Sequence, residues 1–342
     1  MLLGTKKIKI CTKLVILQII FMLSSANVSA QNVWVREHEP ARNLVTAERL
    51  AADISFLADS LCQGRATGTR GNIDAAFWIQ RQFEYNGLLK FGSSYGKRVY
   101  VGKGLVGHNV IGMIPGSGKE HRDRYIIIGA HYDHLGILDG KMYPGADANA
   151  SGVAAMLSLA RMFSYMQKDG RTYDCNMIFV AFDAKEHSMA GSQSLWKLIE
   201  NGSLKDPVSG KRVTSDKIDF MVNIDQIGSS LVPVKKHRKD YIIMLGNDSL
   251  PEIKRARIDF CNRFYGVNMD ISKSYYGSEN FTKVFIRISD QRVFVDNGIP
   301  AVFFTSGITM STNKTYDRLE SLDLPILKKR IYLIYHWIDK MI

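Results

Sequence analysis

Residues 179–192 read FVAFDAKEHSMAGS, a run of strand-forming residues that breaks into charged side chains. Asp183, Lys185, Glu186 and His187 fall within five positions. Carboxylates and imidazoles at this spacing can hold a metal ion or accept a proton, whereas an ammonium group cannot accept one. The segment is therefore either a working catalytic cluster or the remnant of one.

Two further predicted strands end in residues of the same kind. His131 and Asp133 follow the apolar residues 125–130, and Asp225 follows residues 219–224. In α/β folds the carboxyl ends of parallel strands meet at one edge, where sites form. His, Glu and Asp are the ligands of hydrolytic zinc sites. Taken singly, each has a structural alternative, because a strand-end carboxylate can cap a helix and a lone histidine can belong to the core.

The elements that would position these residues alternate along the chain. Residues 45–88 are expected to be mainly helical, with polar breaks around QGRATGTRGN. Strands are predicted at 109–114, 125–133, 176–182, 219–225, 241–245 and 301–304, and helices at 149–166, from Ala190, from Pro251 and at the C-terminus. Continuous β-branched runs between amphipathic helices predict a three-layer α/β fold, with a mostly parallel sheet flanked by helices in a single domain.

Other kinds of active site find little support. The glycine spacing of residues 112–120 does not fit a phosphate loop, and Glu120 stands where such a loop needs Ser or Thr. The predicted elements provide no Gly-x-Ser-x-Gly nucleophile elbow between a strand and a helix, and Cys175 opens a buried strand. Serine and cysteine nucleophiles are therefore not expected.

The N-terminus predicts secretion. Four lysines precede the apolar run LVILQIIFML, and small residues lead to an Ala30–Gln31 junction. This is the pattern of a signal peptide over residues 1–30, cut after Ala30, and the run is shorter than the ~18 residues of a membrane span. The expected product is a secreted or periplasmic domain, residues 31–342, with no transmembrane anchor.

Charge and cysteine content narrow the choice of partners. Loss of the four lysines lowers the formal charge from +12 to +8, and basic runs occur at 235–239 and 328–330. No aromatic-interleaved basic motif accompanies them, so a solvated surface is favoured over nucleic-acid binding. Cys62, Cys175 and Cys261 form an odd set after signal cleavage, which allows at most one internal disulfide.

Six blocks of the chain resemble, in the same order, the signature blocks of metallopeptidase family 28: HNVIGMIPG, IIIGAHYDHLG, PGADANASGVAAMLSLAR, IFVAFDAKEHSMAGS, MVNIDQIG and NGIPAVFF. The segment LADSLCQGRATGTRGNIDAAFWIQRQF is similar to the lead-in of that family. The family comprises secreted zinc aminopeptidases and carboxypeptidases and includes relatives of glutaminyl cyclases. The resemblance implies their fold and a site for two zinc ions.

Four positions match the implied site. His131 corresponds to a terminal ligand of one zinc, and Asp225 to the acidic ligand of the same ion. Asp133 corresponds to the acid that orients the histidine from outside the metal's own ligands. Glu186 corresponds to the carboxylate ligand of the other zinc.

Other positions depart from the family. GADANASG places Ala148 where the resemblance implies the aspartate that bridges both metals, and Lys185 stands at the position of the general base. Residues 311–323 contain no histidine where the last ligand is implied. Gln291 ends the triplet SDQ, where relatives often carry Ser-Asp-His. Each implied zinc keeps at most two ligands, whereas stable sites use three or four.

These departures predict a secreted family member whose exopeptidase activity is lost or strongly reduced, and which binds a peptide end, a protein N-terminus or another partner. Zinc is expected to bind weakly, at a single site or not at all. The alternative is an active zinc exopeptidase with a rearranged or single-metal site on His131, Glu186 and Asp225. Asp147, His134 or His187 would then be the substitute ligands, although adjacent side chains of extended backbone point to opposite faces.

Overall fold

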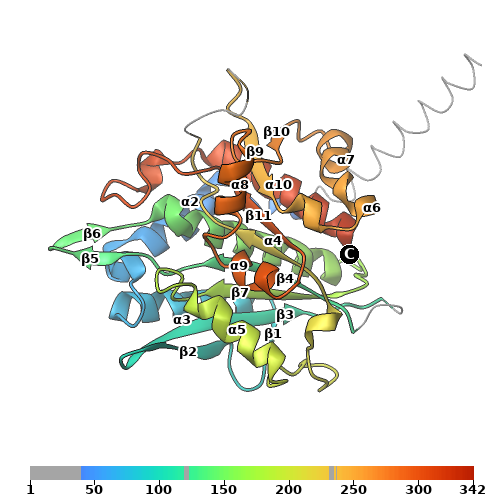
Figure 1. Cartoon of the computed structure of the whole chain (residues 1–342), viewed down its shortest axis with the longest axis horizontal. Helices are drawn as coiled ribbons and strands as arrows, with labels where there is room; N and C mark the ends of the chain where they lie inside the picture. The colour runs from blue at the N-terminus through green and yellow to red at the C-terminus, as the bar shows by residue number, and fades with distance from the viewer. Residues whose placement is uncertain (1–39, 119–122, 231–234, 236) are drawn as a thin grey trace, which may run out of the picture. The chain divides into compact units, whose positions relative to one another are not determined.

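The central strands are buried at almost every position, so both faces of the sheet are covered. A computed structural model describes residues 40–118, 123–230, 235 and 237–342, so the predicted signal peptide at 1–30 lies outside the described residues (Figure 1). Residues Leu44–Ile342 form one compact unit. Its nine-stranded sheet has the order β1-β3-β7-β4-β8-β11-β9-β10, and β2 also pairs with β3.

The strands that carry the predicted site are parallel neighbours. β4 (Tyr125–His131) lies between β7 (Asn176–Phe182) and β8 (Ile218–Ile224), and β11 (Ala301–Thr305) follows β8, all in parallel register. The predicted mixed sheet with a parallel centre is confirmed.

The margins of the sheet are largely antiparallel. β1 (Leu89–Lys90) and β2 (Gly96–Gly102) pair with β3 (Leu105–Ile114), which pairs with β7. On the other side β9 (Tyr241–Leu245) runs antiparallel to β11, and β10 (Asp270–Ser272) runs parallel to β9. A separate hairpin joins β5 (Gly136–Leu138) to β6 (Lys141–Tyr143).

Helices cover the two faces of the sheet because successive strand residues point to opposite sides. On one face, α5 (Ala190–Glu200) and α9 (Gln291–Asp296) bury apolar residues against Ile127, Val180 and Met221. The other layer holds α4 (Gly152–Lys168), with α2 (Ala47–Ala58), α3 (Arg70–Tyr85) and α10 (Leu324–Met341) (Figure 1). This is the predicted three-layer arrangement.

Short elements complete the unit: η1 (Ser60–Arg65), η2 (Ala146–Ser151), η3 (Ser215–Lys217), η4 (Asn247–Ser249), α6 (Glu252–Arg255), α7 (Arg257–Phe264), α8 (Glu279–Phe285) and η5 (Leu319–Ser321). The helix predicted from residue 149 begins only at Gly152. Residues 146–151 form an irregular turn instead, because Asn149 and Ser151 bond to backbone groups outside a helical pattern. Cys62, Cys175 and Cys261 are buried and free.

Candidate functional site

The ends of β4 and β8 bring the first two predicted residues into contact. The His131 ring is 1% exposed, and its Nε2 lies 3.2 Å from Asp225 Oδ1. Burial alone would lower the pKa of His131, but the charge of Asp225 and a bond to Asp133 raise it to about 10. Burial would likewise raise the pKa of Asp225, yet His131, Lys185 and Ser289 together hold it well below its usual range. The two side chains therefore form an ion pair.

Asp133 contacts the turn that follows β7 as well as His131. Its backbone carbonyl, not its carboxylate, is the closer partner of His131, at 3.1 Å from Nδ1 against 3.6 Å for Oδ1. The buried carboxylate accepts the backbone N–H groups of Lys185 and Glu186, both at 3.0 Å. Asp133 therefore fixes the turn that follows β7 as well as the histidine.

Lys185 and Glu186 pair with each other on that turn. Lys185 Nζ donates to Glu186 Oε1 at 3.1 Å, and their side chains are 19% and 26% exposed. Burial lowers the pKa of the Lys185 ammonium, but the charges of Asp225, Glu186 and Asp133 outweigh it, so the pKa lies above its usual value. The position implied for a general base is thus held by a cation whose proton is stabilised by three acids.

Ala148 lies in η2, at the position implied for a bridging acid, and is 3% exposed. The neighbouring Asp147 does not substitute for it. The Asp147 carboxylate accepts from Gly228 N at 2.8 Å and Ser151 Oγ at 3.1 Å, and also from Ser229 Oγ. These bonds direct Asp147 toward the segment after β8.

Asp317 was missed by the sequence analysis. Its buried carboxylate accepts the backbone N–H groups of Asp147 at 2.9 Å and Ala148 at 3.1 Å. Burial, with the neighbouring Asp147 charge, raises the pKa of Asp317 to about 6. The available indication was its place in the segment 311–323, where the resemblance implies the last ligand.

The two other histidines considered as substitutes are not joined to this cluster by any bond found among the described residues. His134 is 2% exposed, neither of its ring nitrogens has a hydrogen-bond partner in the described part of the chain, and burial holds its pKa well below its usual value. His187 is exposed on the turn before α5.

Asp183, the first acid of the opening segment, belongs to the scaffold. Its buried carboxylate accepts from Thr67 Oγ1, Asn72 Nδ2 and Tyr132 OH within 3.0 Å, and from backbone N–H groups that include that of His108. A Cβ on Gly107 would lie 2.5 Å from its Oδ2, so the close approach requires glycine there. Burial and the charge of Asp133 raise the pKa of Asp183 to about 6.

A polar chain extends from Asp225 behind the site. Ser289 Oγ donates to Asp225 Oδ2 at 2.7 Å, and Asn223 Nδ2 donates to Ser289 Oγ at 3.0 Å and to Gln291 Oε1 at 2.6 Å. Gln291 is fully buried and also donates to backbone carbonyls at the end of α8. It therefore supports Asp225 through Asn223 and Ser289.

Arg65 is a second residue that the sequence analysis missed. Its buried guanidinium donates to the backbone carbonyls of Leu57, Tyr132, Pro144 and Gly145. Burial lowers its pKa to about 10, which leaves the group charged at neutral pH. Arg65 thereby ties the segment after β4 to the approach to η2.

The donor set can be tested for its fit to zinc. The 3.2 Å between His131 Nε2 and Asp225 Oδ1 is close to the ~3.3 Å edge expected between two ligands of one tetrahedral zinc. A catalytic zinc, however, uses three protein ligands. Among the described residues, no group of three or more His, Cys, Asp or Glu side chains is placed to hold a metal ion. The spacing of the pair fits zinc, and the number of donors does not.

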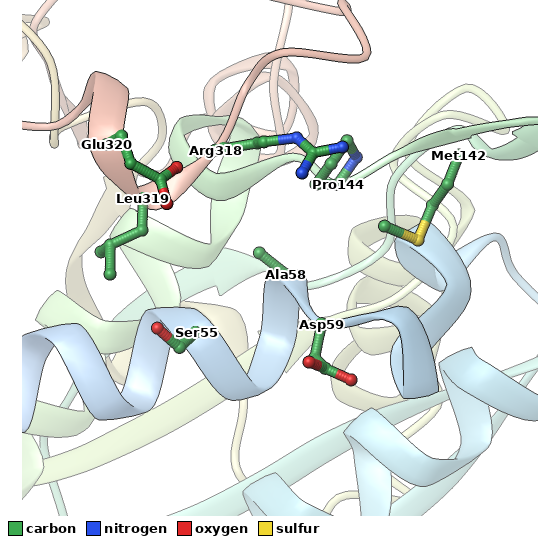
Figure 2. Close-up of a pocket in the computed structure, with 8 residues that line it drawn as sticks. All are labelled: Ser55, Ala58, Asp59, Met142, Pro144, Arg318, Leu319 and Glu320. Atoms are coloured by element: carbon green, nitrogen blue, oxygen red, sulfur yellow. The ribbon is translucent and has the colours of Figure 1, made fainter.

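One hollow of the surface lies apart from these residues. It has a volume of about 180 Å³ and is lined by Ser55, Ala58, Asp59, Met142, Pro144, Arg318, Leu319 and Glu320. Figure 2 shows the end of α2 on one side and residues 318–320 across from it. None of the site residues described above lines it.

The chain belongs to peptidase family M28, whose model matches residues 109–338. A probable zinc metalloprotease of Pyrenophora tritici-repentis is 32% identical over 116 residues, which cover 33% of this chain and 23% of that protein. The human BOS complex subunit NCLN is 29% identical over 164 residues, which cover 48% of this chain and 27% of that protein. The chain thus matches about a quarter of the length of these relatives.

The fold is also found in solved structures. LapB of Legionella pneumophila superposes with a TM-score of 0.66 at 19% identity, over 90% of this chain and 74% of that one. At this identity the likeness concerns the fold alone. Within the described part of the chain, no helix has the length and apolar character needed to cross a membrane.

Proposed function

We propose that this chain is a secreted M28 protein with lost or strongly reduced exopeptidase activity, which acts by binding a peptide end or a protein partner. The observation that carries the proposal is the Lys185–Glu186 ion pair at 3.1 Å. A general base must accept a proton from the attacking water, and the Lys185 ammonium has none of the required basicity. Loss of a general base alone commonly costs about 10²- to 10⁴-fold in rate.

The residues at positions 147 and 148 also favour a loss of exopeptidase activity. Ala148 offers no donor atom. The Asp147 carboxylate already accepts hydrogen bonds from Gly228 and Ser229, which follow β8. When bound, zinc would supply Lewis-acid polarisation and an activated water. With fewer than three ligands, this chain's residues are not expected to retain it. The relatives named as BOS complex subunits support a role in an assembly, whereas those named as zinc metalloproteases support the alternative.

The alternative, an active exopeptidase with one metal, is favoured by one observation. His131 and Asp225 keep a spacing that suits two ligands of a single zinc. In that case a small anion or water would have to complete the coordination, and a residue other than Lys185 would have to act as base.

Hydrolysis of aminoacyl arylamides by the purified protein, with zinc present, separates the two functions. We expect a rate indistinguishable from the buffer control. Turnover at ordinary enzyme rates, abolished by a chelator, would contradict the proposal and establish the alternative. Secretion is tested separately, by expressing the full chain and sequencing the N-terminus of the exported product, which we expect to begin at Gln31.

A further inference from the structure

Another hollow of the surface lies at the C-terminal end of α4, whereas Ala148 precedes the N-terminal end of that helix. It has a volume of about 260 Å³ and is lined from the first turn of α2, the C-terminal end of α3 and the second half of α4. At the ~1.5 Å rise per residue of an α-helix, Lys168 lies about 24 Å along α4 from Gly152. None of the residues of the candidate site lines this hollow.

Arg161 of α4 is the lining residue that points to a ligand. Its side chain is only 4% exposed, and its Nη2 donates to the buried carboxylate of Asp53. Its Nε and Nη1 have no hydrogen-bond partner among the described residues. Buried polar groups nearly always have a partner, because a buried donor without one is costly. The remaining donors of Arg161 therefore suit an acceptor that enters the hollow.

The charges around Arg161 favour an anion. Arg49 and Lys168 also line the hollow, and neither forms an ion pair within the part of the chain that the structure describes. Among the described residues no acid lines the hollow, and Asp53 is the acid bound to its cations, so the three positive charges and one negative leave a net charge of +2. Lys168 also offsets the dipole at the end of α4. That role does not account for Arg49 or for the unpaired donors of Arg161.

Two tyrosines line the same hollow. Tyr85 of α3 is 76% exposed, and Tyr165 of α4 is 39% exposed. An aromatic ring offers a flat apolar face, which can pack against the organic part of a ligand. The hydroxyl of Ser164, another lining residue, already donates to the carbonyl of Asn86. The hollow thus combines cationic donors with aromatic surface.

We propose that this hollow binds a phosphate monoester, with the phosphate on its three cations and the organic group against its two tyrosines. Guanidinium and ammonium groups are the usual partners of phosphate oxygens. A phosphate monoester carries close to two negative charges at neutral pH, which matches the net charge of the hollow. The inference goes beyond the proposed function, because the hollow shares no residue with the candidate site.

Isothermal titration calorimetry with phenyl phosphate tests the proposal. The protein is first freed of metal by a chelator and dialysed, so that the probe cannot bind through a metal ion. We expect saturable binding, about fivefold tighter than that of inorganic phosphate, which lacks the ring, and of phenyl sulfate, which carries a single charge. The absence of binding, or equal binding of either comparison anion, would overturn the proposal.

Variants of the two outer cations locate the binding. Lys168→Gln and Arg49→Gln should each weaken the binding of phenyl phosphate by about fivefold, because each removes one charge-assisted contact. Lys197→Gln is the matched control, since Lys197 is also an exposed lysine in the last turn of a helix, but on α5. We expect this control to bind as wild type does. An equal loss in the control would show that net charge alone sets the affinity and would overturn the proposal.

Arg161 is tested together with Asp53, because removal of one member of this buried pair leaves the other charge uncompensated. Arg161→Gln/Asp53→Asn removes both charges and keeps polar side chains. A folded double variant, checked by circular dichroism, should bind phenyl phosphate at least about tenfold more weakly than wild type. Wild-type affinity in this variant would overturn the proposal. If the double variant does not fold, wild-type affinity in both Lys168→Gln and Arg49→Gln would overturn it instead.

Discussion

Two buried aspartates hold the two loops that carry Ala148 and Lys185. Asp133 accepts the N–H groups of Lys185 and Glu186, and Asp317 accepts those of Asp147 and Ala148. In each case one carboxylate grips two consecutive backbone amides. These four hydrogen bonds involve the backbone of the loops and not the side chains at positions 148 and 185.

The two carboxylates differ in their electrostatic surroundings. Burial opposes ionisation of both, but hydrogen bonds and the charge of His131 hold the pKa of Asp133 below its usual value. At Asp317 burial prevails, and the nearby Asp147 adds to it, so the pKa rises to about 6. The charge of His131 thus helps to keep the Asp133 carboxylate ionised. The Asp317 carboxylate makes its two hydrogen bonds although burial disfavours its charge.

The largest expected effect on stability comes from weakening the hydrogen bonds that Asp133 accepts from Lys185 and Glu186. Asp133→Asn should reduce the free energy of unfolding by about 3 kcal/mol at neutral pH, because an amide can accept only one of the two buried N–H groups and carries no charge. Urea denaturation measures the change. The control is Asp59→Asn, since Asp59 also accepts a backbone N–H, from Leu61 at 2.8 Å, but is exposed. If Asp59→Asn lowers the free energy of unfolding as much as Asp133→Asn does, the special role of the buried Asp133 is contradicted.

Asp317→Asn tests the raised pKa of Asp317 through the pH dependence of stability. The folded pKa of Asp317, about 6, lies above the value of about 3.9 for an unfolded aspartate. The folded state therefore holds this proton longer, and wild type loses stability as the pH rises from about 4 to 6, with the full cost present above 6. The variant lacks this loss. Its destabilisation relative to wild type should be about 2 kcal/mol smaller at pH 7.5 than at pH 4.5. Urea melts at the two pH values that show an equal or larger cost at pH 7.5 would contradict the assignment.

The smallest expected effect is on activity. The double variant Ala148→Asp/Lys185→Glu returns acids to both loops but supplies no histidine within residues 311–323. We expect its arylamide hydrolysis, with zinc present, to remain far below that of an intact zinc aminopeptidase assayed alongside it. Restoration of a comparable rate would show that the two loops alone had set the loss.

The sequence predicts the central strands and the meeting of His131 with Asp225, because long apolar strands and the rule for parallel strand ends are local or general in origin. It does not predict the role of Asp317, whose bond to Asp147 spans 170 positions. It also does not predict the bonds of Arg65 to four backbone carbonyls, or that α4 begins at Gly152 and not at residue 149. These features depend on which backbone groups remain unpaired once the chain has folded, and apolar periodicity carries no information about them.

We propose that this M28 chain does not form a paired zinc site. Elemental analysis of the purified protein, incubated with zinc and then dialysed against metal-free buffer, tests it directly. We expect well below one tightly held zinc per chain, because the described residues of the site provide fewer than three ligands for each ion. Close to two retained zinc ions per chain would contradict it.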